Sequence, residues 1–299
     1  MFGSVFSYHP EVACGADIDS CCRINSSGYY SLNSSITSYT DLGSGDSCIY
    51  IINDDVVLDL NGFSISNVDN TNDKAIYLLA QNVTIFNGSI NNSYYSIYIF
   101  EEGAQNISIY DVNITNITEE GITCEVQCIN LNITNVLLSS NNTDSIGISL
   151  EGGNYNSISY GVFSTLCHGL NIYNEDNLSV SYIEIDECDY GLIIENIYES
   201  NFTNISINRC LFGLTLDGYF EEIKINDNNI TNSFYSLNFN NIELENLIHE
   251  TDFTNTLVDG KEILIYNDTS DLDISSVSPA VLIFHNITNS LISNINISN

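Results

Sequence analysis

The feature that most constrains this 299-residue chain is an internal repeat with a period of 22 to 27 residues. Large apolar residues anchor the repeat, and a second large apolar residue stands five positions after each anchor. Residues an odd number apart on one straight strand face opposite sides, so the chain must turn a corner between the two. The nine pairs are Leu60/Ile65, Ile85/Ile90, Ile109/Ile114, Leu131/Val136, Ile158/Phe163, Val180/Ile185, Phe202/Ile207, Ile225/Ile230 and Ile248/Phe253.

A third strand follows in each period, and it often opens with glycine before an alternating apolar pattern. Each period therefore corresponds to three short strands joined by bends, which predicts one coil of a parallel β-helix. The predicted fold class is all-β, a single-stranded parallel β-helix of about ten or eleven coils with a Cys-rich N-terminal cap. The glycine-led strands begin at Gly121-Ile122, Gly147-Ile148, Gly169-Leu170, Gly191-Leu192 and Gly213-Leu214.

Asparagine, which occurs 43 times, supports bends at fixed positions. Asn tolerates the left-handed conformation of a tight bend, and stacked Asn side chains can hydrogen-bond along the axis. The predicted ladder lies seven residues after the anchors, with plain Asn abundance as the alternative explanation. Its members are Asn67, Asn92, Asn116, Asn232 and Asn255, and its interruptions are Leu138, Thr165, Glu187 and Arg209.

The repeat divides the chain into four predicted parts. Residues 1–50 form the Cys-rich N-terminal cap, and residues 51–255 form the parallel β-helix repeats. Residues 256–284 form a hairpin insertion, in which Val258-Asp259-Gly260-Lys261 has the sequence of a hairpin turn. Residues 285–299 resume the repeat as an incomplete final coil, because Ile292 and Ile297 restore the apolar pair. An open end exposes a strand edge, which suggests self-assembly or a covering partner there.

Eight of the nine cysteines are candidates for disulfides. Cys188 and Cys210 stand 22 residues apart at equivalent positions, so adjacent coils would bring them within the separation that a disulfide accepts. A stack of free thiols acting as small apolar side chains is the alternative, and Cys167 is the odd residue. The other candidates are Cys14, Cys21, Cys22 and Cys48, which precede the regular repeats and whose pairing stays open, and Cys124 and Cys128, which flank a bend.

The chain carries 39 Asp and Glu against 5 Lys and Arg, a formal net charge of −34. This charge excludes nucleic-acid binding, and it disfavours anionic membranes and acidic polysaccharides. No apolar run approaches the ~20 residues that cross a bilayer, so no membrane span is predicted. The cysteines and sequons indicate an extracellular or cell-surface location, and the first 13 residues have no signal-peptide pattern, so we expect that a leader is absent from this chain.

Seventeen N-x-[S/T] sequons occur, about twice the number that chance predicts for this composition. The excess indicates some glycosylation, although the pattern N-[IV]-[ST] also satisfies strand alternation. The candidate sites are Asn82, Asn106, Asn113, Asn116, Asn132, Asn177, Asn204, Asn229 and Asn286.

Calcium is the one candidate cofactor. Three acidic loops offer oxygen ligands, but none has a defined calcium-binding signature, and a solvated polar loop is the alternative reading of each. The four His residues are scattered and no CxxC occurs, so no transition-metal site is indicated. The acidic loops are Asp69–Asp73, Asp227–Asn229 and Asn267–Asp273.

No catalytic residues are predicted. Asn142-Thr143-Asp144 and His168-Gly169 superficially resemble two motifs of polygalacturonase-type glycoside hydrolases, but the paired Asp and the basic motif of that family have no counterpart here. A lyase needs Arg or Lys, and Arg209 and Lys224 lie at unrelated positions of their coils. Two carboxylates flanking a neutral sugar are conceivable, with an acidic outer face as the alternative. The carboxylates are Glu184, Asp186, Glu187 and Asp189.

Two segments carry a family resemblance. Val56–Ile65 (VVLDLNGFSI) and Asn82–Ile90 (NVTIFNGSI) resemble the right-handed parallel β-helix repeats of pectin-lyase-like proteins. More narrowly, they resemble the NosD-like, carbohydrate-binding and sugar-hydrolase repeats of archaeal and bacterial surfaces, and Val258–Ile297 is similar to a hairpin insertion of such repeats. The resemblance covers about residues 48–299 and implies the fold, but its members include adhesins, surface-layer components and enzymes alike.

Two functions are therefore open. The first is a non-catalytic, glycosylated extracellular surface protein with a structural, adhesive or assembly role, whose partners are surface glycans or other envelope proteins. The alternative is a carbohydrate-binding or carbohydrate-active, glycoside hydrolase-like β-helix protein, in which exposed tyrosines stack on sugars. The candidate tyrosines are Tyr155, Tyr160, Tyr173 and Tyr182.

Overall fold

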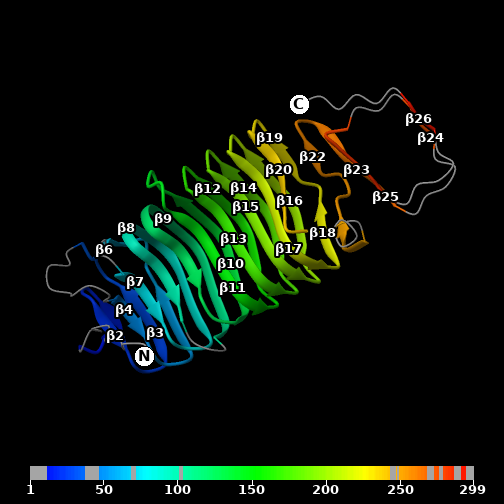
Figure 1. The fold of residues 1–299 in the computed structure, drawn as a ribbon. Helices are drawn as coiled ribbons and strands as arrows, with labels where there is room; N and C mark the ends of the chain where they lie inside the picture. The colour runs from blue at the N-terminus through cyan, green and yellow to red at the C-terminus, as the bar shows by residue number, and fades with distance from the viewer. Residues whose placement is uncertain are drawn as a thin grey trace, which may run out of the picture.

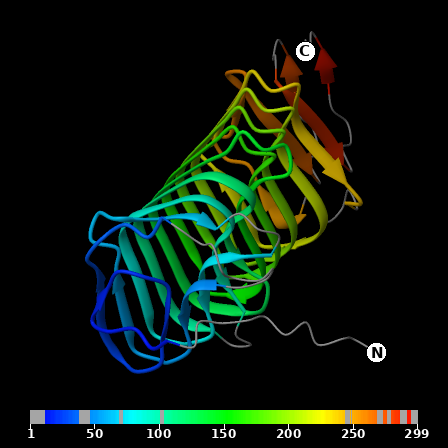
Figure 2. The same ribbon diagram turned by 90° about the vertical axis from the view of Figure 1, so that its left-hand side faces the viewer.

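The computed structural model describes residues 12–37, 47–68, 72–100, 104–242, 247, 249–267, 273–275, 279–285 and 291–293. The chain forms a β-solenoid of about nine turns, and 69% of the described residues lie in strands. Figures 1 and 2 show successive turns stacked along one axis, with the N-terminal turns at one end and the C-terminal segment at the other. The predicted parallel β-helix is confirmed, with fewer turns than the ten or eleven expected.

Three parallel ladders run along the stack, one on each face. The first ladder contains β1 (Asp17–Ile18), β3 (Gly28–Leu32), β5 (Val56–Asp59), β18 (Ile223–Asn226) and β21 (Thr251–Asp252). The second contains β6 (Ser64–Val68), β19 (Asn229–Thr231) and β22 (Leu257–Val258). The third contains β2 (Cys22–Ile24), β4 (Ser47–Ile51), β7 (Lys74–Leu78), β11 (Ile146–Asn154), β13 (His168–Asp176), β15 (Tyr190–Tyr198), β17 (Phe212–Glu221) and β20 (Tyr235–Asn240).

Six longer strands bend around the corner between the first and second ladders and belong to both. Two of them, β8 and β9, continue into the third ladder. The six are β8 (Val83–Ile99), β9 (Gln105–Cys124), β10 (Cys128–Ser139), β12 (Ser157–Ser164), β14 (Ser179–Asp186) and β16 (Asn201–Asn208).

The strand register confirms that the anchors stack and corrects some of their positions. Ile109 pairs with Ile133, not Leu131, and Ile133 pairs with Ile158. The second member of that pair is accordingly Leu138, which is the register partner of Ile114 and Phe163. A shift of two residues leaves strand alternation unchanged, so the sequence pattern fits both alignments. The anchors that pair as predicted are Ile85 with Ile109, Ile158 with Val180, Val180 with Phe202 and Phe202 with Ile225.

Two further anchors shift at the ends of the repeat. Leu58, rather than Leu60, pairs with Ile85, because the Asn61-Gly62 turn adds two residues before Ile65. Near the C-terminus, the pairing of β18 with β21 aligns Phe253 with Ile225, and Ile230 pairs with Val258. The last anchor pair is therefore Phe253/Val258, and Ile248 lies outside the described residues.

The glycines that open third-ladder strands are required by close approach of the next turn. A Cβ atom on Gly191 would lie 2.6 Å from the carbonyl oxygen of Gly213 and 2.7 Å from Cγ2 of Ile207. Separations below 3 Å cannot be accommodated when the contacted atom is backbone, so glycine is the residue that fits. The same approach to the following turn recurs at Gly121, Gly147, Gly169 and Gly213.

The corners are made by residues with left-handed backbone conformation, most of them Asn or Asp. The predicted Asn ladder exists in part, since Asn92 donates to Asn67 Oδ1 at 3.1 Å. Its interruptions Thr165, Glu187 and Arg209 keep the left-handed conformation, with φ of 54°, 56° and 54°. The sequence therefore placed this corner correctly even where Asn is missing.

One interruption and one member of the predicted ladder are misplaced. The register aligns Ser140, not Leu138, with Asn116, and Leu138 is instead buried in the core. Asn255 belongs to the corner between the first and second ladders, where it donates to Asp227 Oδ1 at 2.9 Å. A further ladder that the sequence analysis missed lies before the first ladder, where the bonds run from Asn130 to Asn106 and from Asn106 to Asn82.

The Cys-rich N-terminal segment adds its own strands to the ladders, since β1 pairs with β3 and β2 with β4. Disulfides join Cys14 to Cys22 and Cys21 to Cys48, which fixes the pairing that the sequence left open. Cys124 and Cys128 also form a disulfide, across the bend that they flank. Cys167, Cys188 and Cys210 are free thiols in this structure, and the bridge considered between Cys188 and Cys210 stays a prediction.

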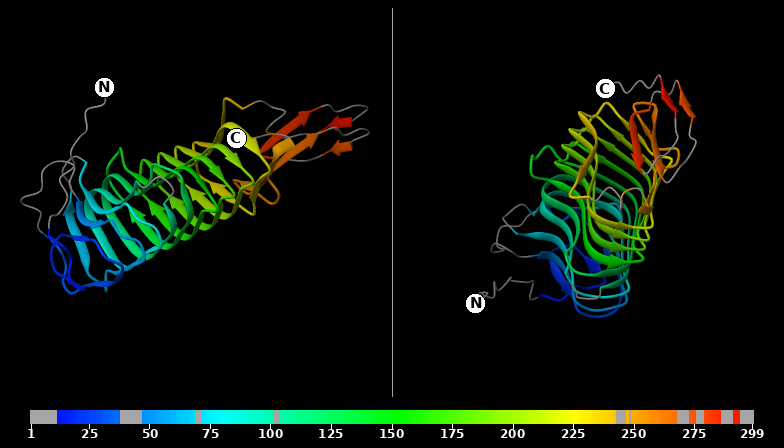
Figure 3. Two further views of the ribbon diagram at one scale, coloured as in Figure 1. Left: turned by 90° about the horizontal axis from the view of Figure 1, so that it is seen from below. Right: turned by 45° about the vertical axis from the view of Figure 1, so that its right-hand side comes forward.

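The C-terminal segment leaves the stack through a hairpin. β22 pairs antiparallel with β23 (Lys261–Asn267) across Asp259 and Gly260, whose φ values of 48° and 74° suit the Asp-Gly sequence. Beyond it β23 pairs in parallel with β25 (Val281–His285), and β24 (Asp273–Ser275) pairs with β26 (Leu291–Ser293). These strands lie beyond the end of the regular turns (Figure 3). Ile292 pairs with Ile274 there and not with the main stack, while Ile297 is outside the described residues.

Candidate functional site

The first-ladder face carries three exposed tyrosines on two consecutive turns. Tyr155 precedes and Tyr160 follows the first-ladder part of β12, and Tyr182 follows that of β14. Their exposed fractions are 61%, 57% and 52%. The register places Tyr160 beside Tyr182, and their ring centroids are 4.9 Å apart with planes inclined by 2°. A parallel aromatic pair thus stands at one end of this strand pair and a single ring at the other.

All three tyrosines occupy left-handed corners, with φ of 57°, 55° and 55°. The same corner positions on the neighbouring turns hold asparagine. A bulky L-residue in this conformation costs on the order of 1 kcal/mol, whereas Asn adopts it readily. Tyrosine is therefore unfavourable for the backbone of this bend. Its presence at three corners indicates a role for the exposed side chain. The flanking residues are Asn130 and Asn177 for Tyr155, Asn135 for Tyr160 and Asn204 for Tyr182.

Hydroxyl groups line the surface between these tyrosines. Ser157 and Ser159 point outward from β12, because the residue between them, Ile158, is buried in the core. Ser157 Oγ donates to Asn132 Oδ1 at 2.9 Å, and Ser159 Oγ lies 3.2 Å from Thr134 Oγ1 on the preceding turn. Ser179 and Ser181 hold the equivalent outward positions on β14.

These seven residues define what we call the tyrosine strip: Tyr155, Ser157, Ser159, Tyr160, Ser179, Ser181 and Tyr182. Its two ends are five residues apart along the strand, which is roughly 15 Å. Tyr173, the fourth candidate tyrosine, lies on β13 in the third ladder as the register partner of Glu195. It is half-buried, and burial and the charge of Glu195 raise its pKa. The structure thus brings three of the four candidates together and leaves Tyr173 on another face.

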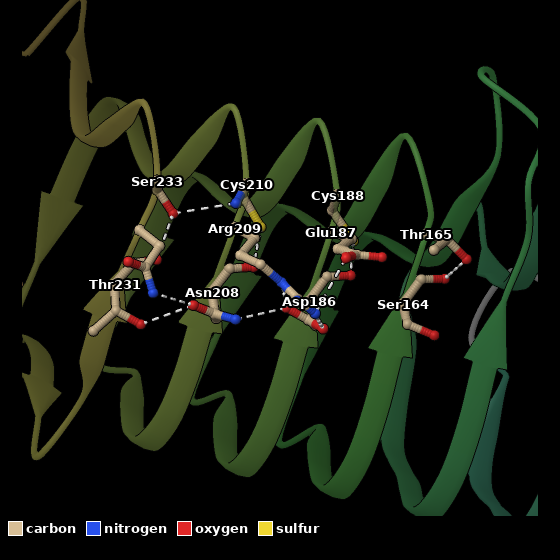
Figure 4. Close-up of polar contacts among 11 residues, drawn as sticks. Ser164, Thr165, Asp186, Glu187, Cys188, Asn208, Arg209, Cys210, Thr231 and Ser233 are labelled. Atoms are coloured by element: carbon tan, nitrogen blue, oxygen red, sulfur yellow. Dashed lines mark hydrogen bonds and ion pairs between the residues drawn. The ribbon is translucent and has the colours of Figure 1, made fainter.

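Two of the four acidic residues considered as catalytic carboxylates, Asp186 and Glu187, contact a cation, whereas Glu184 and Asp189 are exposed. Arg209 Nε donates to Asp186 Oδ1 at 3.0 Å, and Arg209 Nη2 contacts Asp186 Oδ2 and, at 3.2 Å, Glu187 Oε1. Figure 4 shows these contacts at the corner between the second and third ladders. The hydrogen bond from Arg209 holds the pKa of Asp186 below its ordinary value. Asp186 is therefore a structural carboxylate that links adjacent turns.

Asn142 and His168, which resemble polygalacturonase motif residues in the sequence, form hydrogen bonds within the fold. Asn142 Nδ2 donates to the carbonyl of Thr118 at 2.9 Å, and Asn142 Oδ1 accepts from the amide of Asp144 at 3.2 Å. His168 Nδ1 lies 2.9 Å from Asn171 Nδ2, and burial lowers the pKa of the imidazole although Asp189 opposes this. Asn142 therefore has a structural role in its loop, and His168 has one in its strand.

The sequence analysis missed one buried carboxyl group, Glu175, and one half-buried carboxyl group, Glu120. Glu175 is fully buried, its Oε2 accepts from Asn156 Nδ2 at 2.8 Å, and its Oε1 has no partner. Glu120 is half-buried at the start of a third-ladder strand, beside its register partner Tyr95. Burial raises the pKa of each to about 7, opposed at Glu120 by a hydrogen bond from Thr123 at 2.5 Å. The corner geometry that turns Glu175 inward is not visible in a linear pattern.

Among the described residues, no group of three or more His, Cys, Asp or Glu side chains is arranged to hold a metal ion. Of the acidic loops, Asp227 accepts from Asn255, while residues 69–71 and 268–272 lie outside the described residues. Of the candidate sequon residues, Asn177 is half-buried, Asn286 lies outside the described residues, and the others are exposed. In the described part of the chain, no helix is long and apolar enough to span a membrane.

Comparisons with known proteins give a likeness of structure and none of sequence. No protein-family model matches the chain, and no curated protein sequence matches it. An endo-xylogalacturonan hydrolase from Aspergillus tubingensis is similar in structure, with a TM-score of 0.50 and 12% identity over 92% of this chain and 87% of that one. A polygalacturonase from Erwinia carotovora ssp. carotovora has a TM-score of 0.44 and 12% identity over 93% and 89%.

A tailspike protein of E. coli bacteriophage HK620 has a TM-score of 0.46 and 8% identity, over 95% of this chain and 71% of that one. At these identities the likeness concerns the fold alone. The chain thus has the right-handed parallel β-helix fold of pectin-lyase-like proteins.

Proposed function

We propose that this chain is an extracellular carbohydrate-binding protein and that its tyrosine strip binds a neutral glycan. One observation carries the proposal: three exposed tyrosines share one face of two adjacent turns, in corner positions where the backbone favours asparagine. Residues held in an unfavourable conformation cluster at functional sites, because selection for the side chain offsets the backbone cost.

The chemistry of the strip suits a sugar chain. Tyrosine rings pack against the C–H faces of sugars while their hydroxyl groups stay in water. The serine hydroxyls between them, with Asn132 and Thr134 on the preceding turn, supply donors and acceptors for sugar hydroxyls. The net charge of −34 repels acidic polysaccharides, so the glycan should be neutral.

An extracellular location is supported by three disulfides, which persist in oxidising compartments. The Aspergillus protein of similar fold is a hydrolase of xylogalacturonan, a polysaccharide, which makes a glycan a reasonable ligand for such a surface. Adhesion to a glycan-bearing surface would be one use of the strip. Glycosylation, envelope-protein partners and self-assembly stay predictions.

The test measures affinity for neutral oligosaccharides by glycan array followed by calorimetry. We expect Tyr160→Asn and Tyr182→Asn each to weaken binding about tenfold, since each removes one stacking ring. Asparagine suits the corner, so both variants should fold. Tyr235→Asn on the third ladder, where Tyr235 is 50% exposed, is the control and should bind normally. Equal affinity of all three variants and the wild type would reject the tyrosine strip as the binding site.

Glycoside hydrolysis is a second candidate, favoured by Glu120. A carboxyl group with a pKa of about 7 can donate a proton at neutral pH, and the charges of Glu125, Glu119 and Glu151 act on Glu120 from nearby. A reducing-sugar assay on neutral glycans tests this, with Glu120→Gln expected to abolish release. Turnover that persists in Glu120→Gln, or its absence from the wild type, would reject this candidate.

A further inference from the structure

The corner between the second and third ladders brings two free thiols together on adjacent turns. Cys188 and Cys210 are each 3% exposed. Their Sγ atoms point toward equivalent acceptors, the carbonyl of Asp186 at 3.6 Å and that of Asn208 at 3.5 Å. Figure 4 shows the two side chains next to each other on consecutive turns. The thiols are therefore in matched orientations within one layer of the stack.

The backbone around the two cysteines is held at the spacing of adjacent strands. The amide of Leu211 donates to the carbonyl of Cys188 at 3.1 Å, and the amide of Glu187 donates to the carbonyl of Asn208 at 3.1 Å. Adjacent parallel strands lie ~4.8 Å apart, within the Cα separation that a disulfide accepts. Gly191, whose missing Cβ would lie 3.5 Å from Cys210 Sγ, leaves room beside the sulfur.

We propose that Cys188 and Cys210 form a disulfide that staples two consecutive turns, an oxidation site that goes beyond the proposed glycan binding. The oxidant is a low-molecular-weight disulfide such as oxidised glutathione. The thiolate of Cys210 attacks it and releases one glutathione, and the thiolate of Cys188 then attacks the mixed disulfide and releases the second. Two protein thiols are oxidised, one glutathione disulfide is reduced to two glutathione molecules, and the two protons leave on them.

The two thiols are also hydrogen-bonded to each other, and this bond determines which of them attacks first. It lowers the pKa of Cys210 and raises that of Cys188, so Cys210 is the thiol that more readily ionises. Cys167 is a poorer competitor, because burial and the charges of Asp189 and Asp144 raise its pKa.

The bonds between turns at this corner give a structural reason for a disulfide there. The Asn ladder of this corner is interrupted at the left-handed positions Thr165, Glu187 and Arg209. Cross-turn bonds there come instead from Arg209 to Asp186 and from Asn208 to Asp186, the latter at 2.8 Å. A covalent link at Cys188 and Cys210 would add to these bonds at the point where the ladder is missing.

The experiment refolds reduced, denatured full-length protein in a glutathione redox buffer, traps free thiols with iodoacetamide in acid denaturant, and maps peptides without reduction. We expect the Cys188–Cys210 cross-linked peptide and a single alkylated cysteine, Cys167. The bridge closes a loop of 22 residues. The thermal unfolding midpoint of the oxidised wild type should therefore exceed that of the Cys188→Ser/Cys210→Ser variant by about 5 °C.

Two controls keep the outcome clear. Cys188→Ser should leave Cys167 and Cys210 alkylated, which shows that the pairing is specific. If refolding yields are low, the folded wild type is oxidised instead in urea below its unfolding midpoint and mapped in the same way. Native-like protein with three alkylated cysteines, with stable glutathione adducts, or with a bridge to Cys167 would each overturn the proposal.

Discussion

Replacing Glu175 with glutamine should stabilise the protein at neutral and alkaline pH and change little near pH 4.5. Glu175 is fully buried, and only its Oε2 atom has a hydrogen-bond partner, Asn156. A buried ionised carboxylate that lacks a cationic partner is costly, so burial raises its pKa from 4.5 to about 7. Glutamine has the same shape and keeps the acceptor for Asn156, but it cannot ionise.

The magnitude follows from the two pKa values. The folded state binds the proton of Glu175 more tightly than the unfolded chain does, so unfolding releases a proton and stability falls as pH rises. The loss begins near pH 4.5, the ordinary pKa, and is complete above pH 7. It amounts to about 3 kcal/mol at pH 8, which corresponds to about 5 °C in the unfolding midpoint for a chain of this size.

The assay is urea unfolding of the wild type and Glu175→Gln, followed by circular dichroism between pH 4.5 and pH 8. The difference in unfolding free energy between the two proteins should grow with pH in favour of the variant. Glu120, which has a similar pKa, is present in both proteins and cancels from the difference. A pH-independent difference would refute the reasoning, because it would mean that Glu175 is not buried as a neutral group.

Three further outcomes are expected. Gly191→Ala should lower the unfolding midpoint sharply or prevent folding, since its Cβ would meet the Gly213 carbonyl at 2.6 Å; thermal melts and soluble yield measure this, and a normal melt would contradict the close approach. Arg209→Gln should cost less than about 1 kcal/mol, because the Arg209 side chain is 52% exposed, yet it should raise the pKa of Asp186 in an NMR titration; an unchanged pKa would count against the contact. Cys21→Ser should lower the midpoint more than Cys124→Ser, because the first bridge spans 27 residues and the second 4; the reverse order in melting curves would contradict a loop-entropy origin.

Much of the fold can be predicted from the sequence, because the features that mark strands, corners and close contacts recur at a fixed period. An offset of five between apolar residues requires a corner, and the structure has left-handed residues at those corners. The recurring glycine marks the close approach of the next turn, and Asp259-Gly260 marks the hairpin. The exact register is less legible, as Leu131 and Ile133 show: strand alternation repeats every two residues, so both alignments satisfy the same pattern.

Only the tertiary structure shows which side chains of different turns become neighbours. Tyr160 and Tyr182 lie side by side while Tyr173 lies on another face, because the lengths of all the intervening corners together set where each residue falls around the axis. The burial of Glu175 has the same origin, since a corner reverses the inward and outward positions that simple alternation assigns. The sequence by itself determined that the chain coils and where it bends. The stacking of the turns determined which faces carry tyrosines and serines, and which acids and thiols are enclosed.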